Sequence, residues 1–160
     1  MTNSPSSEST DPQTPAVVGQ ILTGEAFVVT REDVERFESG TWVDRAYPEG
    51  DIPEFPEDLV EGFHLLSLVD PVLQFALGDS RGGMWGLNYG LDKVRFVSQV
   101  HIGDRVVPTF ETLAVEPKDG GFKVLRRCTF TVEGGERPAM VADWWGYQLP
   151  RGVVEKSRRP

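Results

Sequence analysis

The residues best suited to acid–base chemistry lie in one acidic, proline-rich stretch. Positions 44–58 read DRAYPEGDIPEFPED, with six carboxylates, three prolines and one glycine. Paired carboxylates divide the roles of acid and base when their surroundings separate their pKa values. Asp44 and Glu49 are the candidate pair, because Trp42, Tyr47 and Phe55 offer apolar surface that would raise the pKa of one of them. The alternative interpretation is a solvated acidic loop.

The chain has two histidines and one cysteine. His64 falls in an apolar segment, so it is either a core histidine bonded to a neighbour or a catalytic group. His101 falls in a predicted turn, where a structural role is expected. Cys128 alternates with apolar residues and is predicted to be a small buried hydrophobe. No metal-ligand spacing or phosphate-binding loop is present, so we expect neither a metal nor a bound cofactor.

The elements that must position these residues follow from periodicity. Residues 20–29 predict a short strand, and Thr30 with Asp33 predicts a capped helix that ends at residues 39–40. Residues 40–58 are expected to be irregular because of their prolines. Apolar residues at three- and four-residue spacing predict one buried helix over 59–77, which Pro71 interrupts.

The second half of the chain alternates as strands do. It predicts four antiparallel strands, with a hairpin turn between the second and the third: 88–97, 105–115, 122–132 and 138–149. Arg126 breaks the alternation, because it falls on the apolar face of its strand. One helix against one antiparallel sheet is an α+β arrangement.

Length and composition set the domain plan and exclude some partners. The 160 residues predict one domain over 19–150, with a disordered arm at 1–18 and a flexible tail at 151–160. A net charge of −9 argues against nucleic acid and anionic membranes as partners. A local basic patch for an anionic ligand stays possible, built from Lys123, Arg126, Arg127 and Arg137; otherwise these are solvated side chains.

The expected compartment is the cytoplasm. We find no secretory signal and no apolar run long enough to span a membrane. A single cysteine excludes an internal disulfide framework, which agrees with reducing surroundings.

Four segments, in order and spacing, resemble one known family. They are VTREDVERFESG, EGFHLLSLVDPVL, GLNYGLDKVRFVSQVHIGDRV and PAMVADW. They resemble the MaoC-like (R)-specific enoyl-CoA hydratase/dehydratase family and extend from residue 22 to about residue 149. The resemblance implies a hotdog fold, in which an antiparallel sheet wraps around a central helix. It also implies a homodimer with sheets joined edge to edge, and an acyl-thioester substrate carried by coenzyme A or acyl carrier protein.

The resemblance also assigns roles to residues. Gly62 would bind the thioester carbonyl through its backbone N–H, and Asp44 falls near the family's catalytic aspartate. The family's catalytic histidine position falls on Glu49, and the histidine that precedes the helix glycine is replaced by Glu61.

Other residues are expected to line the substrate pocket: Tyr47, Asn88, Tyr89 and Gly90. His64 is the candidate that replaces the missing histidine from another position. A helix places it roughly 200° around from Gly62, which weakens that assignment.

Three functions remain open. The first is a hydratase or dehydratase with a rebuilt active site, working by acid–base proton transfer. The second is a catalytically silent hotdog subunit or ligand-binding module, which pairs with an active partner in a heterodimer. The third is a related reaction on a small molecule that is not a thioester.

Overall fold

The computed structural model describes residues 16–48, 56–78 and 84–150. In these ranges no helix is both long and apolar enough to cross a membrane. The elements, in chain order, are β1 (Ile21–Thr23), β2 (Phe27–Val28), α1 (Arg31–Thr41), α2 (Val43–Ala46), α3 (Gly62–Ser67), α4 (Val69–Leu77), β3 (Met84–Phe96), β4 (Arg105–Lys118), β5 (Gly121–Val132) and β6 (Met140–Pro150).

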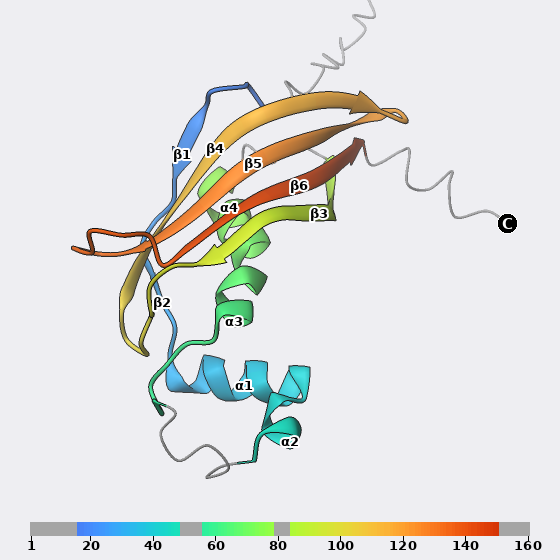
Figure 1. Cartoon of the computed structure of the whole chain (residues 1–160). Helices are drawn as coiled ribbons and strands as arrows, with labels where there is room; N and C mark the ends of the chain where they lie inside the picture. The colour runs from blue at the N-terminus through green and yellow to red at the C-terminus, as the bar shows by residue number, and fades with distance from the viewer. Residues whose placement is uncertain (1–15, 49–55, 79–83, 151–160) are drawn as a thin grey trace, which may run out of the picture.

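The strands form one antiparallel sheet, curved over α3 and α4 (Figure 1). Its order is β1-β4-β5-β6-β3, and β2 pairs with the other end of β4. The predicted hairpin between β4 and β5 is confirmed. Its turn residues Asp119 and Gly120 both have positive φ, at 42° and 78°, as a two-residue turn between twisted strands requires. The four predicted strands are present. Three begin or end one to four residues further out than predicted at one end, and the last begins two residues late and ends one residue later.

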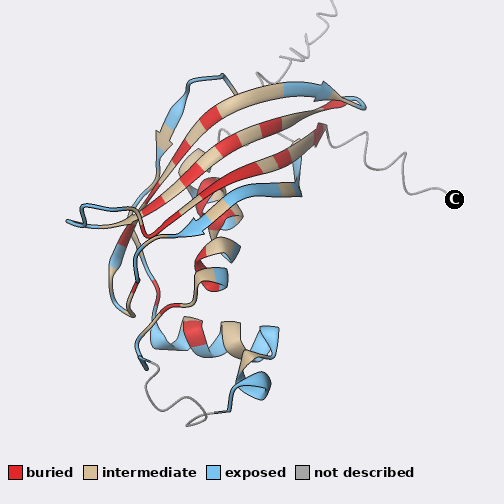
Figure 2. Ribbon diagram, viewed as in Figure 1, coloured by how far each residue is buried: buried red, intermediate tan, exposed pale blue. Residues whose placement is uncertain are grey.

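The inner face of the sheet holds the core. Phe110, Cys128 and Ala142 are cross-strand neighbours on β4, β5 and β6, and all are almost fully buried. Helix α4 packs Val72 and Leu73 into the same cluster. Buried residues therefore recur at every second position along these strands (Figure 2). The predicted α+β hotdog arrangement is confirmed.

The central helix begins later than predicted and has a break. Leu59 is not helical; it forms an isolated bridge with His101. The helix starts at Gly62 and divides at Leu68, so that α4 is a separate segment. Pro71 explains the break, because its ring would collide with the carbonyl of Ser67, four residues earlier. In the first turn of α4 its missing N–H costs no hydrogen bond.

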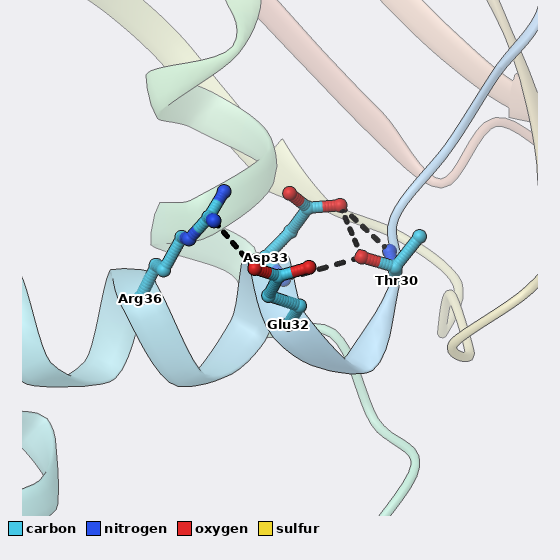
Figure 3. A network of polar contacts seen from close by, with 4 residues as sticks. All are labelled: Thr30, Glu32, Asp33 and Arg36. Atoms are coloured by element: carbon cyan, nitrogen blue, oxygen red, sulfur yellow. Dashed lines mark hydrogen bonds and ion pairs between the residues drawn. The ribbon is translucent and has the colours of Figure 1, made fainter.

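The N-terminal prediction is partly confirmed. Thr30 and Asp33 form a reciprocal capping box at the start of α1, and Arg36 pairs with Glu32 one turn on (Figure 3). The predicted helix end at residues 39–40 is wrong. Trp42 adopts the left-handed conformation, with φ of 68°, and ends α1 in the manner usually reserved for glycine.

Two further expectations need correction. The single strand expected over 20–29 is two short strands, separated by an irregular segment at residues 24–26. The stretch 40–58 was expected to lack helix, but α2 forms one turn before the first of its prolines.

The outer face of the sheet carries a buried carboxylate. Arg127 donates two hydrogen bonds to Asp143, at 2.9 and 3.1 Å, and the Lys93 ammonium lies 3.2 Å from the same group. Burial alone would raise the pKa of Asp143, but the hydrogen bonds from Arg127 and Lys93 outweigh it and lower the pKa. Lys93 reaches this position from a bulge in β3, with φ of 50°.

We predict that Asp143→Asn destabilises the fold by about 3 kcal/mol, because two cations lose their buried partner. The folded pKa of Asp143 is depressed, so its contribution is present above the ordinary carboxyl pKa and is lost as the pH falls through the folded value. Urea unfolding of both proteins at several pH values measures this. Glu35→Gln is the control, since Glu35 is exposed on α1 and makes no hydrogen bond or ion pair through its side chain in the described chain. An equal loss in both variants would contradict the prediction.

Candidate functional site

The start of α3 is formed by a glycine packed under an aromatic ring. A Cβ on Gly62 would lie 2.8 Å from ring atoms of Phe96, the last residue of β3. Phe63 then meets Phe96 edge to face, with ring centroids 6.1 Å apart. The Gly62 N–H belongs to the first helical turn and has no hydrogen-bond partner in the described chain. Gly62 therefore serves packing as well as leaving a backbone donor available.

Glu61 is the N-cap residue of α3 and is half-buried, and its side chain makes no capping hydrogen bond. Loss of solvation raises the pKa of its carboxyl, and repulsion from Glu38 adds to the rise. A carboxyl with a raised pKa is a better proton donor near neutral pH than an ordinary one.

His64 lies on the other side of the helix from Phe96. Its ring stacks on Phe37 of α1, with centroids 4.5 Å apart, and only 5% of the residue is exposed. It lines a pocket of about 750 Å³ between α1, α4 and the β1–β2 segment, together with Asp33 and Arg36. His64 faces α1 and Gly62 faces Phe96, so the structure does not place the imidazole beside the Gly62 N–H.

The imidazole of His64 is buried without the hydrogen bond expected of a core histidine. Its Nδ1 is sealed from solvent and has no partner. Burial lowers the pKa of His64, while the nearby Asp33 opposes that shift. The ring is therefore held mainly in its neutral form at neutral pH.

The candidates on α2 are solvated. Asp44 is exposed and makes no hydrogen bond or ion pair in the described part of the chain. Trp42 and Tyr47 are 66% and 63% exposed, so they do not enclose Asp44 within one chain. Glu49 lies outside the described residues.

The candidates on β3 lie far from the helix start. Asn88 pairs across the strands with Gly146, and Phe96 is eight residues further along β3. At about 3.3 Å per residue this separation is roughly 25 Å, somewhat shortened by bulges. Tyr89 faces the outer side of the sheet, where the Lys123 ammonium lies 5.4 Å from its ring. Gly90 is half-buried beside it. Of the predicted site residues that the structure describes, a single chain therefore places only Glu61 and Gly62 side by side.

The free edge of β3 is exposed and carries more large hydrophobic side chains than charged ones, which are Asp92, Lys93 and Arg95. In the described chain β3 pairs with β6 on one side only. Five of its large hydrophobic residues are 45–53% exposed (Figure 2): Trp85, Leu87, Tyr89, Leu91 and Phe96. Edge strands of soluble proteins normally carry charges or are covered. This edge is therefore a surface suited to pairing.

The predicted basic patch does not form as one surface. Arg127 faces outward to Asp143, whereas Arg126 faces inward and is 95% buried, since its exposed fraction is 5%. The only sign of the inward orientation of Arg126 in the sequence was its place on the apolar face of the alternating β5 segment. Cys128 is buried as predicted, and burial raises the pKa of its thiol to about 12. No group of three or more possible metal-ligating side chains occurs among the described residues.

Comparison with solved structures establishes the class of fold. The MaoC-like dehydratase from Rhodospirillum rubrum superposes with a TM-score of 0.65 at 14% identity, over 85% of this chain and 94% of that one. A fluoroacetyl-CoA thioesterase superposes with a TM-score of 0.60 at 18% identity, over 92% of this chain and all of that one. At such identities the likeness shows the hotdog fold alone.

Sequence comparison goes further. The 3-hydroxyacyl-thioester dehydratase Z of Mycobacterium tuberculosis is 32% identical over 120 residues, which cover 72% of this chain and 79% of the relative. No protein-family profile matches the chain. The chain belongs to the MaoC-like hydratase/dehydratase family, as its motifs predict.

We predict that Gly62→Ala destabilises the fold by about 1–3 kcal/mol, because its Cβ overlaps the Phe96 ring. Adding Phe96→Ala removes the obstacle, so the double variant should be more stable than the sum of the single changes predicts. Thermal unfolding of the four proteins measures this coupling. Gly90→Ala is the control, since a Cβ there meets nothing within 4 Å. Strict additivity would show that Phe96 does not pack on Gly62.

We also predict that the folded His64 titrates below its ordinary pKa of 6.5. The unfolded chain then binds more protons, so His64 subtracts stability as the pH falls from about 6.5 towards the folded value. Imidazole NMR signals followed against pH test this, and His64→Phe identifies the signal by its disappearance. A midpoint at or above 6.5 would contradict the prediction.

Proposed function

We propose that this chain is a hydratase or dehydratase that adds or removes water across the 2,3-double bond of an acyl thioester of coenzyme A or acyl carrier protein. The observation that carries the proposal is the 32% identity to a 3-hydroxyacyl-thioester dehydratase over 120 residues. The alignment covers 79% of that relative's length, so the likeness extends over most of its chain and is not confined to one motif.

The thioester is proposed to bind at the start of α3. Its carbonyl oxygen would accept a hydrogen bond from the Gly62 N–H, where the positive end of the helix stabilises developing negative charge. Phe63 and Phe96 supply an apolar floor for the acyl group. An ionised carboxylate beside this point would oppose the charge, so the raised pKa of Glu61 supports a protonated, hydrogen-bonding role.

Acid–base transfer is proposed to rest on carboxyls. In hydration one base takes a proton from water as its oxygen attacks carbon 3, and one acid returns a proton to carbon 2. Asp44 and Glu49 remain the proposed pair. His64 is a poorer candidate for this role, because it packs against Phe37 on the opposite side of the helix from Phe96.

The working form is proposed to be a homodimer joined through β3. Antiparallel pairing of two β3 edges about a two-fold axis covers the exposed apolar side chains of both copies. It also places the start of β3 in one copy beside the end of β3 in the other. Pairing centred near Asp92 places Asn88 of the partner subunit opposite Phe96, which removes the separation found within one chain. Gly90 of the partner subunit would then border the same pocket, with Tyr47 at its rim. Tyr89 faces the outer side of the sheet, so it would contact the partner subunit on that side and not the acyl chain.

A catalytically silent subunit is the second candidate. Asp44 is exposed and without a hydrogen bond, which is unlike a positioned catalytic group. In this case the β3 edge would pair with a different hotdog chain that carries the catalytic pair. The buried, unpaired thiol of Cys128 agrees with a reducing compartment, so we propose a cytoplasmic location for either form.

We predict that the purified protein consumes crotonyl-CoA or longer 2-enoyl-CoAs, measured as loss of the enoyl absorbance. Asp44→Asn and Glu49→Gln should each lower kcat/KM by at least about 100-fold, the usual scale of acid–base assistance. Glu136→Gln is the control, because Glu136 is exposed and is not one of the residues proposed to form the site. Absence of turnover at every chain length, with a monomeric mass in solution, would favour the silent subunit.

A further inference from the structure

Arg126 is a positive charge placed under the helix-covered face of the sheet. On β5 it pairs across the strands with Thr112 and Trp144, which are themselves 4% and 5% exposed. The flanking inward residues, Val124 and Cys128, are fully buried. An apolar side chain would be expected at this position.

This charge has no partner in the described chain. Arg126 makes no ion pair and its guanidinium donates no hydrogen bond. Cys128 is the titratable group that interacts with it, but a thiol whose pKa is raised to about 12 stays neutral. Asp70, the one carboxylate of α4, accepts a hydrogen bond from Gln74 instead. Asp143 faces the other side of the sheet.

An arginine cannot escape burial by losing its proton, because its pKa is too high. A buried ion without a partner is strongly unfavourable, and arginine is the side chain best shaped to bind a carboxylate with two parallel hydrogen bonds. The free chain therefore carries a cost that an anionic ligand would remove.

The guanidinium is also within reach of a ligand. In the described chain, two side-chain nitrogens are shielded from solvent and make no hydrogen bond. They are the Nδ1 atoms of His64 and His101. The latter lies in an ion-pair contact with Asp58, 3.1 Å away. The nitrogens of Arg126 are unbonded but not sealed, so each keeps some contact with solvent.

The position of Arg126 relative to the proposed thioester site follows from the strand register. Phe96, which packs on Gly62, pairs with Met140, and Met140 pairs with Phe130. Arg126 is four residues back along β5, about 13 Å, and two strands across from Phe96, about 10 Å, so the direct separation is roughly 16 Å. Both lie on the inner face. The Arg126 side chain spans part of this distance, and a medium-length acyl chain spans the rest.

We propose that Arg126 binds a carboxylate at the distal end of the acyl chain, so that the preferred substrates are thioesters of dicarboxylic acids. This inference rests on the proposed function for the position of the thioester. The guanidinium would recognise the terminal carboxylate, and the surrounding apolar residues would hold the methylene chain.

The test compares binding of two saturated thioesters of equal length by calorimetry: adipoyl-CoA, which ends in a carboxylate, and hexanoyl-CoA, which ends in a methyl group. We expect wild type to bind adipoyl-CoA at least about tenfold more tightly. In Arg126→Met the ratio should fall to one or invert, and Arg126→Lys should restore part of it. Arg105→Met, an exposed arginine on β4 paired with Glu133, is the matched control. Equal binding of the two ligands by wild type would overturn the inference.

Thermal unfolding without ligand supplies a second readout. If Arg126 is unpaired, Arg126→Met should raise Tm by a few degrees, whereas loss of a structural partner would lower it. Adipoyl-CoA should raise Tm of wild type more than hexanoyl-CoA does, and this difference should disappear in the variant. A lowered Tm in the free variant would also overturn the inference. Because binding is measured with saturated thioesters, it stands apart from turnover: enoyl hydration that persists without carboxylate preference would remove the inference and leave the proposed function.

Discussion

The packing of the central helix against the inner face of β4, β5 and β6 is the constraint on which the rest of the molecule depends. Val72 and Leu73 of α4 join Phe110 and Phe130 in one core cluster. Each fully buried side chain of this size contributes roughly 1.5–3 kcal/mol through removal from water. Because the helix is held along its whole length, its first residue is fixed relative to the last residue of β3. The contact of Gly62 with Phe96 is thus a consequence of the core.

The same helix divides the interior into two sides with different chemistry. Towards β3 it presents Gly62, with an open backbone donor and an aromatic ring packed on its Cα. Towards α1 it presents His64, stacked on Phe37 and kept neutral by burial. One helical turn therefore cannot supply both an amide for a thioester and an imidazole for its proton transfer. This physical separation, more than the missing histidine itself, shifts the proposed chemistry to carboxyls.

The fold was largely predictable from sequence because its signals are local. Alternation located the strands of the second half of the chain, turn residues located the β4–β5 hairpin, and Thr30 with Asp33 located the cap of α1. The central helix was placed three residues early, because Leu59 fits the apolar spacing but is held in extended conformation by its bridge to His101. That contact joins distant parts of the chain, and no local pattern reports it. The site was less predictable for the same reason. Gly62 and Glu61 are neighbours in sequence, whereas the distance of Asn88 from them depends on strand register.

Two buried charges on neighbouring strands show what the sheet can accommodate. Asp143 and Arg126 are both almost fully buried, on β6 and β5. Asp143 receives two hydrogen bonds from Arg127 and one contact from Lys93, so its ionised form is retained at low cost. Arg126, one residue from Arg127, points to the opposite face and has no such partner. Side chains alternate between the two faces of a strand, so the adjacent Arg126 and Arg127 face opposite sides of the sheet. Arg127 has an ionic partner there, and Arg126 has none in the described chain. Strand geometry alone completes the first pair, whereas Arg126 has no counter-ion among the described residues, which is why we propose that a ligand carboxylate completes the second.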